Sequence, residues 1–426
     1  MALLTKAPRG TADVLPGESF RLRYLENTLA EIAGDFGFRE IRTPVFEHTE
    51  LFNRSVGETT DVVQKEMYTF EDNGQRSITL RPEGTAGCAR AFLEHGLFNE
   101  PLPQKLFYLT SCYRYEKPQA GRLREFHQFG IESLGTQSPA ADAEIIALAR
   151  SVFDRFGLEG INLEINSIGC PKCRKAYHAS LLEYFKNRKG DLCETCLSRL
   201  ERNPMRILDC KSPVCSEIAK DAPAVLDFLC DECSQHFDAV KKYLDSMDIA
   251  YTVNPRIVRG LDYYTKTVFE FVSTGIGAQG TVCGGGRYDG LLAQLGGQPL
   301  PASGFGMGIE RLLLLIDAQG KKIADEPRVD LYLAPATPDN SFAAMKIVKD
   351  LRAAGFIALT DLEGRSVKSQ MKYANKKNAR FTAVLGDTEL ADGVLNIKDM
   401  DNGTENSVSL KDFPNGFSRL LSSSDN

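Results

Sequence analysis

The sequence predicts an α+β fold: an antiparallel sheet flanked by helices, interrupted by a helical insertion and followed by a C-terminal α/β domain. Short β-like runs separated by turns occupy about residues 66–135. Cysteine pairs, charges and helical patches fill residues 170–250, and strand and helix patterns alternate over residues 329–421. These three observations define the class, and 426 residues are enough for about two to four domains.

The domain boundaries follow from the same shifts in pattern. We expect the sheet domain to comprise residues 1–168 and 251–322, with the insertion at 169–250 and the C-terminal domain at 328–426. The mostly polar segment Lys321–Pro327 is typical of a linker.

Composition is ordinary for a globular protein, with 42% apolar and 25% charged residues. Apolar runs such as Leu312–Ile316 are far shorter than the ~20 residues that a membrane helix requires, and residues 1–10 contain no apolar segment of a secretory signal. We therefore expect a cytoplasmic protein without a membrane partner. The net charge of −6 argues against a generally basic nucleic-acid coat but not against a local basic face.

The first elements are predicted from periodicity and end signals. Apolar residues at helical spacing predict a helix over Ser19–Phe36, with Ser19 as N-cap and Gly37 as the C′ glycine. The alternation over Ile41–Val45 predicts a strand. Pro44 places that strand at an edge or interrupts it, because proline cannot donate to a ladder.

The remaining elements follow in the same way. Ser77–Leu80, Gln104–Thr110 and Glu125–Leu134 are expected to be strands of one antiparallel sheet. Ser138 suits an N-cap, and the proline after it suits the first helical position. The other predicted elements are the helices Pro139–Phe156, Glu310–Ile316 and Ser341–Ala354 and the strands Ile161–Ile165, Val268–Val272, Gly280–Cys283, Val329–Ala334 and Ala379–Leu385.

A strand–loop–strand motif carries the first candidate chemistry. The strand ending in Tyr113-Arg114-Tyr115-Glu116 is followed by the loop Lys117–Leu123 and by a returning strand. The planar fork of Arg114 suits a phosphate, and Phe126 can stack on a purine. Gln128 shares a face with Phe126 if no bulge intervenes. The alternative is a hairpin with a solvated charged face.

The glycine-rich segment Gly304–Arg311 does not have the GxGxxG spacing of a dinucleotide-binding fold. It is better explained by a strand packed closely by glycines and then a helix with Arg311 in its first turn. The helix dipole disfavours a cation there, so an anionic phosphate is the expected partner. The alternative is a surface arginine. Two further segments, Arg256–Thr265 and Gly284–Gly290, are each most simply explained as ordinary turns when taken alone.

Together these motifs resemble those of class II aminoacyl-tRNA synthetases and, within that class, of histidyl-tRNA synthetases. Gly37–Phe46 is similar to the first class II motif, whose proline lies in the dimer-forming strand. The hairpin around Arg114 resembles the second motif, and Gly304–Arg311 the third. The segments 259–264 and 284–290 resemble the two histidine-specific signatures, and Leu80–Thr85 resembles a further substrate-binding segment. The resemblance covers residues 6–320, and the C-terminal domain more loosely.

The resemblance implies a reaction in two steps. Histidine and ATP, with Mg²⁺ bridging the phosphates, would give histidyl-adenylate and pyrophosphate, and the 3′ hydroxyl of the tRNA would then attack the adenylate. Arg114 and Arg259 would be the catalytic residues that grip the α-phosphate and the carboxylate. The resemblance also implies an ATP-binding set, in which Phe126 and Arg311 would sandwich the adenine: Arg114, Glu116, Arg122, Phe126 and Arg311.

The histidine pocket is implied residue by residue in the same way. Glu83, Thr85 and Gln128 resemble the set around the ammonium group, and Glu132 and Tyr264 the set around the imidazole ring. A buried polar pocket rejects isosteres that leave its own groups unpaired. The complete expected set is Glu83, Gly84, Thr85, Gln128, Glu132, Tyr263, Tyr264 and Tyr288. The five histidines of the chain, His48, His95, His127, His178 and His236, show no ligand spacing and are expected to be structural or on the surface.

Eight of the eleven cysteines fall between residues 170 and 233. A disulfide framework is not expected without an export signal. Three CxxC pairs and one CxxxxC pair give enough thiols for two tetrahedral Zn²⁺ sites, and the alternative is a set of reduced, half-buried thiols. Members of the resembled family often lack these cysteines, so any zinc would be structural. The candidate ligands are Cys170, Cys173, Cys193, Cys196, Cys210, Cys215, Cys230 and Cys233.

Basic residues recur near the C-terminus at spacings that would place them on one helix face: Arg365, Lys368, Lys372 and Lys376. The alternative is an ordinary solvated helix. In a synthetase-like chain, the anticodon stem of the tRNA becomes the expected partner. The resemblance also places Gln119 near the extra 5′ nucleotide of the histidine tRNA, and the first motif implies a homodimer.

Two other functions remain open at this stage. A regulatory paralogue of the same family would serve histidine biosynthesis without charging tRNA, but such proteins typically lose the histidine signatures and the anticodon domain. A zinc-dependent nucleic-acid-binding protein would explain the cysteines but would leave Arg114, Arg259 and Arg311 without a role. A histidine-dependent ATP–pyrophosphate exchange assay separates catalysis from both.

Overall fold

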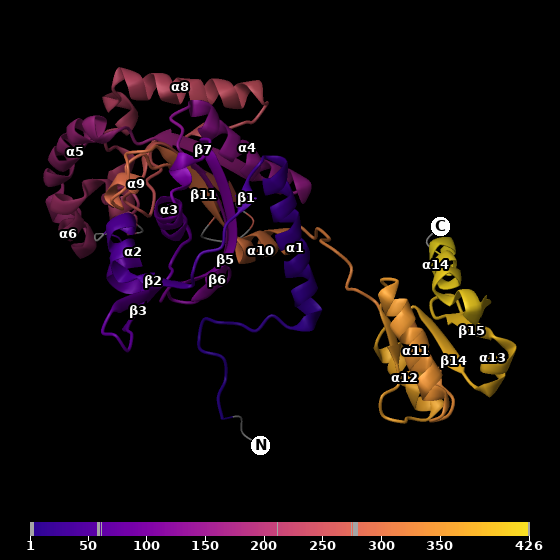
Figure 1. Ribbon diagram of the computed structural model, residues 1–426. Helices are drawn as coiled ribbons and strands as arrows, with labels where there is room; N and C mark the ends of the chain where they lie inside the picture. Colours follow the sequence, from indigo (N-terminus) through magenta and orange to yellow (C-terminus); the bar gives the residue numbers. More distant parts are fainter. Residues whose placement is uncertain are drawn as a thin grey trace. The chain divides into compact units, whose positions relative to one another are not determined.

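The computed structural model describes residues 4–57, 60, 62–210, 212–273, 275 and 280–424. The chain forms two compact units, Met1–Ala324 and Asp325–Asn426, each with its own sheet (Figure 1). The boundary between the two units, after Ala324, falls within the polar segment Lys321–Pro327.

An eight-stranded sheet forms the centre of the first unit, in the order β1-β5-β6-β11-β10-β9-β7-β8. Neighbouring strands from β5 to β7 in this order are antiparallel, as predicted, whereas the edge pairs β1–β5 and β7–β8 are parallel. The strands are β1 (Arg39–Glu40), β5 (Gln104–Tyr113), β6 (Glu125–Leu134), β7 (Ile161–Ser167), β8 (Thr252–Val253), β9 (Thr265–Ser273), β10 (Thr281–Arg287) and β11 (Ala302–Gly308).

Two strand predictions are wrong. Ser77–Leu80 is a strand, β4, but it pairs with β2 (Phe46–His48) and β3 (Tyr68–Glu71) in a separate small sheet. No strand forms over Ile41–Val45. The buried Arg81 guanidinium donates to the carbonyls of Thr43 and Pro44, at 2.9 and 3.1 Å, and so takes up acceptors that a ladder would use.

Helices cover one face of the large sheet and bury its main hydrophobic core. The first begins at Pro16, not at Ser19, because proline suits the first turn; Ser19 therefore lies inside the helix and is not its cap. Gly37 follows with φ +78°, as a C′ glycine requires. Side chains from α1 (Pro16–Asp35), α4 (Pro139–Arg155), α8 (Asp231–Ser246) and α10 (Ile309–Ala318) contribute to this core.

Shorter helices pack against the opposite face, where several polar side chains are buried. A second core there joins α3 to buried tyrosines of the segment that precedes β9. This face includes α2 (Thr49–Val56), α3 (Thr85–Glu94) and α9 (Leu291–Gln294), with the short turns η1 (Val62–Glu66) and η2 (Leu97–Asn99).

The predicted insertion is helical and has a small core of its own. It belongs to the same compact unit as the sheet, and its last helix, α8, packs on α4. In Figure 1, α5 and α6 curve along one side of the unit and α8 lies across its top. Its elements are α5 (Pro171–Lys186), η3 (Lys189–Asp191), α6 (Glu194–Arg202), η4 (Pro204–Ile207), α7 (Pro213–Lys220) and η5 (Val225–Phe228).

The second unit is an α/β domain around a five-stranded sheet in the order β13-β12-β14-β15-β16. The first three strands are parallel and the last two antiparallel. Its strands are β12 (Leu331–Pro335), β13 (Ala358–Thr360), β14 (Phe381–Leu385), β15 (Val394–Asp399) and β16 (Glu405–Ser409); its helices are α11 (Asn340–Ala353), α12 (Val367–Lys376), α13 (Asp387–Asp392), η7 (Leu410–Asp412) and α14 (Phe413–Ser424).

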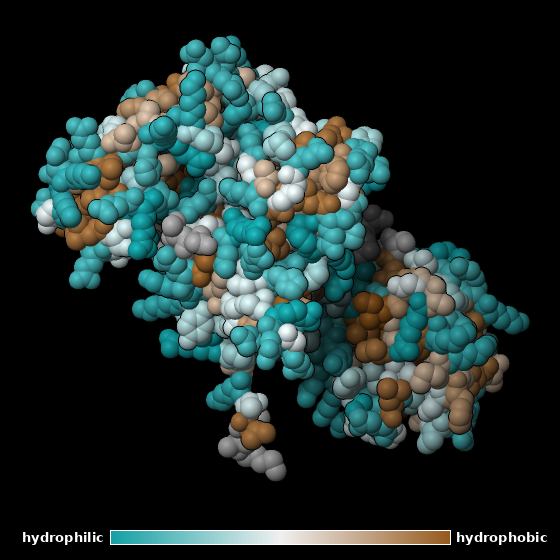
Figure 2. All heavy atoms as spheres, turned by 60° about the vertical axis from the view of Figure 1, so that its left-hand side comes forward, coloured by the Kyte–Doolittle hydropathy of each residue, from teal (hydrophilic) through white to brown (hydrophobic). Residues whose placement is uncertain are grey.

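Hydrophilic side chains predominate on the face in Figure 2, and hydrophobic ones form scattered patches. None of the described helices combines the length and the hydropathy needed to cross a bilayer.

Candidate active site

A buried carboxylate, Glu132, lies at the centre of a polar network on this face. It lies on β6, opposite Leu106 of β5 and Gly304 of β11, and is only 1% exposed. Thr85 Oγ1 and Tyr108 OH donate to Glu132 Oε1 at 2.7 and 3.0 Å, and Tyr288 OH donates to its other oxygen. Burial raises the pKa of Glu132 to about 8. The carboxylate is therefore poised to gain from a cationic or hydrogen-bond-donating ligand.

A second buried carboxylate, Glu83, fixes the corner where the chain enters α3. It accepts hydrogen bonds from the backbone N–H groups of Thr85 and Ala86, at 2.7 and 2.9 Å. Burial raises its pKa. Gln128 Oε1 accepts from the N–H of Gly84 at 3.1 Å, so β6 is tied to the same corner. Thr85 bonds both Glu83 and Glu132, which joins the two sequence-predicted halves of the pocket into one network.

Three buried tyrosines form the aromatic wall beside Glu132. The ring centroid of Tyr263 lies 4.7 Å from the ring centroid of Tyr264 and 5.3 Å from that of Tyr288. Burial raises the pKa of all three phenols, which therefore stay protonated and available as donors.

Arg259 lies at the edge of this wall. Its guanidinium forms an ion pair with Glu270 of β9 and lies 5.4 Å from the centroid of the Tyr264 ring. Glu270 also accepts from Thr281 Oγ1 at 2.9 Å. A side chain at Gly284 would clash with this guanidinium, so the glycine makes room for it. The segment Gly284–Arg287 is thus part of β10, and its interpretation as an ordinary turn is wrong.

A second cluster of charges surrounds the hairpin of β5 and β6. Arg114 donates to the carbonyl of Pro82 at 2.8 Å, and its guanidinium lies 5.2 Å from the centroid of the Phe126 ring. The regular β5–β6 register contains no bulge, so Phe126 and Gln128 share a face as predicted. Glu116 pairs with Arg122 at 2.5 Å and lies 3.8 Å from Arg114.

Arg311 occupies the first turn of α10, as the sequence predicted. It donates to the carbonyls of Gly121 and Thr281, at 3.2 and 2.6 Å, which joins the hairpin loop to the start of β10. Burial and the nearby Arg122 lower its pKa, and Arg114 repels it as well. The guanidinium groups of Arg114, Arg122 and Arg311 therefore lie close enough to repel one another, which favours a polyanionic ligand between them.

The remaining sequence-predicted residues lie outside these clusters. Gln119 is exposed in the hairpin loop and pairs through its backbone with Arg122. Lys368, Lys372 and Lys376 are exposed on α12. Arg365 does not belong to that helix, because the helix starts at Val367. Instead Arg365 forms ion pairs with Asp361 and Glu363, at 3.1 and 3.0 Å, and its guanidinium packs on Tyr373.

Sequence reasoning missed several residues of the site. Tyr108 contacts Glu132, and its alternation with Leu106 on β5 is only a weak signal for that role. Glu270 is the partner of Arg259 but lies in an apolar strand. Glu310 of the third motif accepts from the His127 backbone N–H at 2.9 Å and contacts its ring Nδ1 at 2.7 Å, which anchors α10 to β6. The side chain of His127 thus has the structural role expected.

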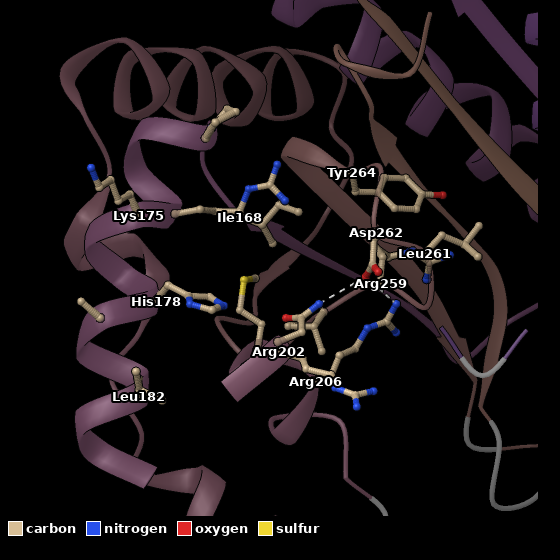
Figure 3. Close-up of a pocket in the computed structure, with 16 residues that line it drawn as sticks. Ile168, Lys175, His178, Leu182, Arg202, Arg206, Arg259, Leu261, Asp262 and Tyr264 are labelled. Atoms are coloured by element: carbon tan, nitrogen blue, oxygen red, sulfur yellow. Dashed lines mark hydrogen bonds and ion pairs between the residues drawn. The ribbon is translucent and has the colours of Figure 1, made fainter. Parts of the chain in front are cut away.

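Beside Arg259 and Tyr264 lies a cavity of about 800 Å³ between the insertion and the segment that precedes β9 (Figure 3). Cationic side chains from α5, α6 and η4 line its insertion side, and Arg259 and Tyr264 are shared with the active site. The basic lining residues are Arg174, Lys175, His178, Arg202, Arg206 and Arg259.

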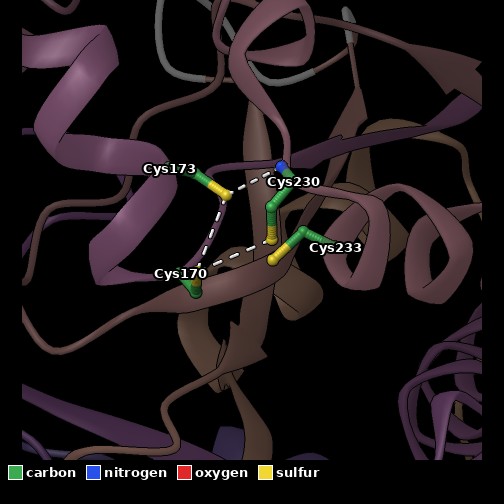
Figure 4. A group of neighbouring side chains, drawn as sticks. All are labelled: Cys170, Cys173, Cys230 and Cys233. Carbon is green, nitrogen blue, oxygen red and sulfur yellow. Dashed lines mark hydrogen bonds between the residues drawn. The ribbon is translucent and has the colours of Figure 1, made fainter.

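The eight clustered cysteines form two groups of four within the described part of the chain. Within each group the sulfur atoms all lie within 4.8 Å of one another. One group, shown in Figure 4, joins the start of α5 to the start of α8. The other joins α6 to α7. The groups are Cys170, Cys173, Cys230 and Cys233, and Cys193, Cys196, Cys210 and Cys215.

Comparison with known proteins agrees with this geometry. A family model described as histidyl-tRNA synthetase matches residues 10–312, and one described as an anticodon binding domain matches residues 330–420. The chain is 53% identical to a Histidine--tRNA ligase of Clostridium novyi, over 98% of this chain and 99% of that protein. It is 52% identical to a Histidine--tRNA ligase of Acetivibrio thermocellus, over 96% and 98%.

Among solved structures, the apo histidyl-tRNA synthetase of S. aureus has a TM-score of 0.84 at 39% identity, covering 97% of this chain and 100% of that one. With its antiparallel sheet and motif-bearing hairpin, the protein is thus a class II aminoacyl-tRNA synthetase. Within that class, the chain belongs to the histidyl-tRNA synthetase family.

Proposed function

We propose that this protein is a histidine–tRNA ligase, which activates L-histidine with ATP and transfers it to the 3′ end of its tRNA. Family membership over nearly the whole chain supports this function. The observation that carries it is the Glu132 network together with the mutually repelling guanidinium groups of Arg114, Arg122 and Arg311. The first suits an imidazole-bearing cation and the second a triphosphate.

In the first step, an oxygen of the histidine carboxylate attacks the α-phosphorus of ATP. A phosphorus–oxygen bond forms to the amino acid, the bond to the bridging oxygen breaks, and pyrophosphate leaves with that electron pair. Arg114 and Arg259 stabilise the negative charge that develops on the α-phosphate and hold the carboxylate in line. Their fixed positions, on the carbonyl of Pro82 and on Glu270, reduce the reorganisation that the step requires.

ATP is held by residues of the second and third motifs. Phe126 and Arg311 enclose the adenine, Arg122 and Arg311 face the distal phosphates, and Glu116 accepts from the adenine amino group or orders Arg114. When bound, Mg²⁺ neutralises charge on the phosphates. Glu116 and Glu270 are the carboxylates of this region that would help to hold the ion, and in the structure both pair with arginines.

Recognition of histidine uses the buried pocket. Glu83, Gly84, Thr85 and Gln128 surround the ammonium group, while Glu132 and Tyr264 hold the imidazole ring, with Tyr263 and Tyr288 as its walls. A side chain without ring nitrogens would leave Glu132 buried and without a ligand partner, which gives discrimination of about 10⁴-fold or more.

In the second step, the 3′ hydroxyl of the tRNA attacks the carbonyl carbon of the adenylate, the ester bond forms, and AMP leaves. Arg365, Lys368 and Lys372 of the C-terminal unit contact the anticodon region, and Gln119 the 5′ end. Because these contacts are ionic or exposed, raised salt weakens tRNA binding more than histidine binding.

The enzyme works as a cytoplasmic homodimer. Val45 and Phe46, next to Pro44 of the first motif, are 42% and 56% exposed. His48, two residues further on, lines a cavity of about 870 Å³ along α2 and α3. Exposed apolar side chains of this segment favour burial against a second copy.

The decisive experiment is histidine-dependent ATP–pyrophosphate exchange with the purified full-length protein, followed by charging of histidine tRNA. Both activities are expected. Exchange that is absent, or that does not depend on histidine, would reject the proposed function. Exchange without charging would indicate a protein that activates histidine for another acceptor.

A further inference from the structure

We propose that the two four-cysteine groups of the insertion each bind one Zn²⁺ ion as a tetrathiolate, and that the ion in the second group holds the Arg259-bearing segment in place through Arg206. The inference does not depend on the proposed function, because metal content and backbone exchange are measured without substrate.

The sulfur positions fit zinc. Four sulfurs about 2.3 Å from a zinc ion at tetrahedral angles lie about 3.8 Å from one another. In the first group, Cys170 Sγ lies 3.6 Å from Cys173 Sγ and 4.0 Å from Cys230 Sγ. In the second, Cys193 Sγ lies 3.8 Å from Cys210 Sγ. These separations are about twice the ~2.05 Å of a disulfide bond, so the thiols surround a centre and do not pair with one another.

The surroundings of the sulfurs suit thiolates. Cys170, Cys193 and Cys230 are the N-caps of α5, α6 and α8, where the helix dipole favours negative charge. In each group a backbone N–H points at a cysteine sulfur of the other pair, from Cys230 to Cys173 at 3.1 Å and from Cys193 to Cys215 at 3.3 Å. Hydrogen bonds of this kind hold the sulfur atoms in the orientation that a metal ligand requires.

The small size of the insertion favours stabilisation by a bound metal. Apart from α8, the insertion is only about 60 residues long, a size at which a single hydrophobic core is marginal and metals or disulfides commonly add stability. Two of the cysteines, Cys196 and Cys215, are themselves part of its small core. Each ion would join segments that are far apart in sequence, residues 170 and 233 in one case and 193 and 215 in the other.

The second group also reaches the active site. The turn η4 lies between Cys196 and Cys210, and Arg206 of this turn donates to the carbonyl of Gly260 at 2.8 Å and to Asp262 Oδ1 at 2.9 Å. Asn203, just before η4, donates to the same oxygen at 3.3 Å. Arg206 and Asp262 are both labelled in the close-up of Figure 3. Arg206 is thus a positioning residue for the segment that carries Arg259 and Tyr264.

The first test is the metal content of full-length protein purified without chelators. We expect two zinc ions per chain, one for each group, and the visible bands of a tetrahedral thiolate after exchange with Co²⁺. Titration of the unmodified protein with a mercurial should release one zinc for every four thiols. Folded protein with less than about one zinc per chain and freely reactive thiols would overturn the proposal.

Single variants then assign the ions. Cys170→Ser and Cys193→Ser replace half-buried ligands, and each should remove one zinc and leave the other. Cys88→Ser, at a buried thiol outside both groups, should keep both ions. Retention of two zinc ions in both ligand variants would reject the ligand assignment.

The positioning role is tested by amide hydrogen exchange over residues 257–264. Cys193→Ser and Arg206→Ala should each accelerate exchange there by about tenfold, the effect of losing a hydrogen bond to a charged group. Because both changes would act through the same contact, the double variant should exchange no faster than either single variant. Cys170→Ser should have a smaller effect on this segment. Additive effects, or an unchanged rate in Cys193→Ser, would show that the second ion does not act through Arg206.

Discussion

The polar groups of the sheet site and the basic residues of α12 are held in different ways. Arg114 and Arg259 are fixed by a carbonyl and a carboxylate, and Glu132 by three hydroxyl groups. Lys368 and Lys372 are exposed and have no ion-pair partner in the described part of the chain. Charges that are fixed and at least partly buried can stabilise one transition state, whereas exposed lysines adapt to a polyanion of variable shape.

The largest expected effect comes from removing the carboxylate of the buried pocket. Glu132→Ala should lower histidine-dependent pyrophosphate exchange by about 10⁴-fold or more, because the pocket loses its partner for the substrate. Circular dichroism should show a folded protein. Glu132→Gln is the matched control for shape, and normal exchange by Glu132→Ala would contradict the assignment.

A smaller loss, about 10²–10³-fold in kcat, is expected for Arg259→Ala, the usual effect of removing one fixed donor to a developing charge. The same assay measures it. Because the change leaves the half-buried Glu270 without its arginine, the double variant Arg259→Ala/Glu270→Gln separates that cost from catalysis. If the double variant recovers wild-type kcat, Arg259 acts only by neutralising Glu270.

The raised pKa of Glu132 predicts a dependence of stability on pH. Burial raises the pKa of Glu132 to about 8 in the folded protein, whereas the unfolded chain releases this proton near the ordinary glutamate pKa of 4.5. The free energy of unfolding contributed by this group therefore falls as the pH rises from 4.5 to 8, by roughly 1 kcal/mol per pH unit. Denaturation of the wild type and of Glu132→Gln across this range measures it, and parallel pH curves would contradict the shift.

The smallest effect on activity or binding is expected for variants of the exposed lysines of α12. Lys368→Ala/Lys372→Ala should weaken tRNA binding by about tenfold at low salt and make its salt dependence shallower, with histidine activation unchanged. Lys346→Ala/Lys349→Ala, on exposed positions of α11, is the matched control. A similar loss in both variants would mean that general charge, and not the face of α12, attracts the tRNA.

Strong local patterns predicted most of the fold. The strand Glu125–Leu134 has the predicted bounds, and Ser138 accepts the N–H of Ala140 as an N-cap. The failures have long-range causes. Arg81 holds residues 43 and 44 out of a ladder, and Asp361 binds the backbone N–H of Arg365 before α12 begins. Neither contact leaves a signal in its own stretch of sequence.

The residues of the candidate site also fall into two groups, those that local motifs indicate and those that they do not. The motif residues around Arg114, Glu132 and Arg311 could be named because the resemblance assigns them, and the structure places Arg114 and Arg311 close enough to repel each other. Tyr108 and Glu270 could not be named from the sequence, because their roles depend on which strand lies opposite them and not on a local motif. Register between distant strands is what single-sequence reasoning cannot supply.

The glycines of β10 and β11 have a consequence for redesign. A methyl group at Gly304 would collide with Glu132 and Tyr288, just as one at Gly284 would collide with Arg259. At Gly304 the backbone carbonyl of Ile131 also closes the space, so this position admits nothing larger than hydrogen, whereas the guanidinium near Gly284 can move aside. Redesign of the proposed pocket for analogues of histidine must therefore start at its aromatic walls and not at Gly304.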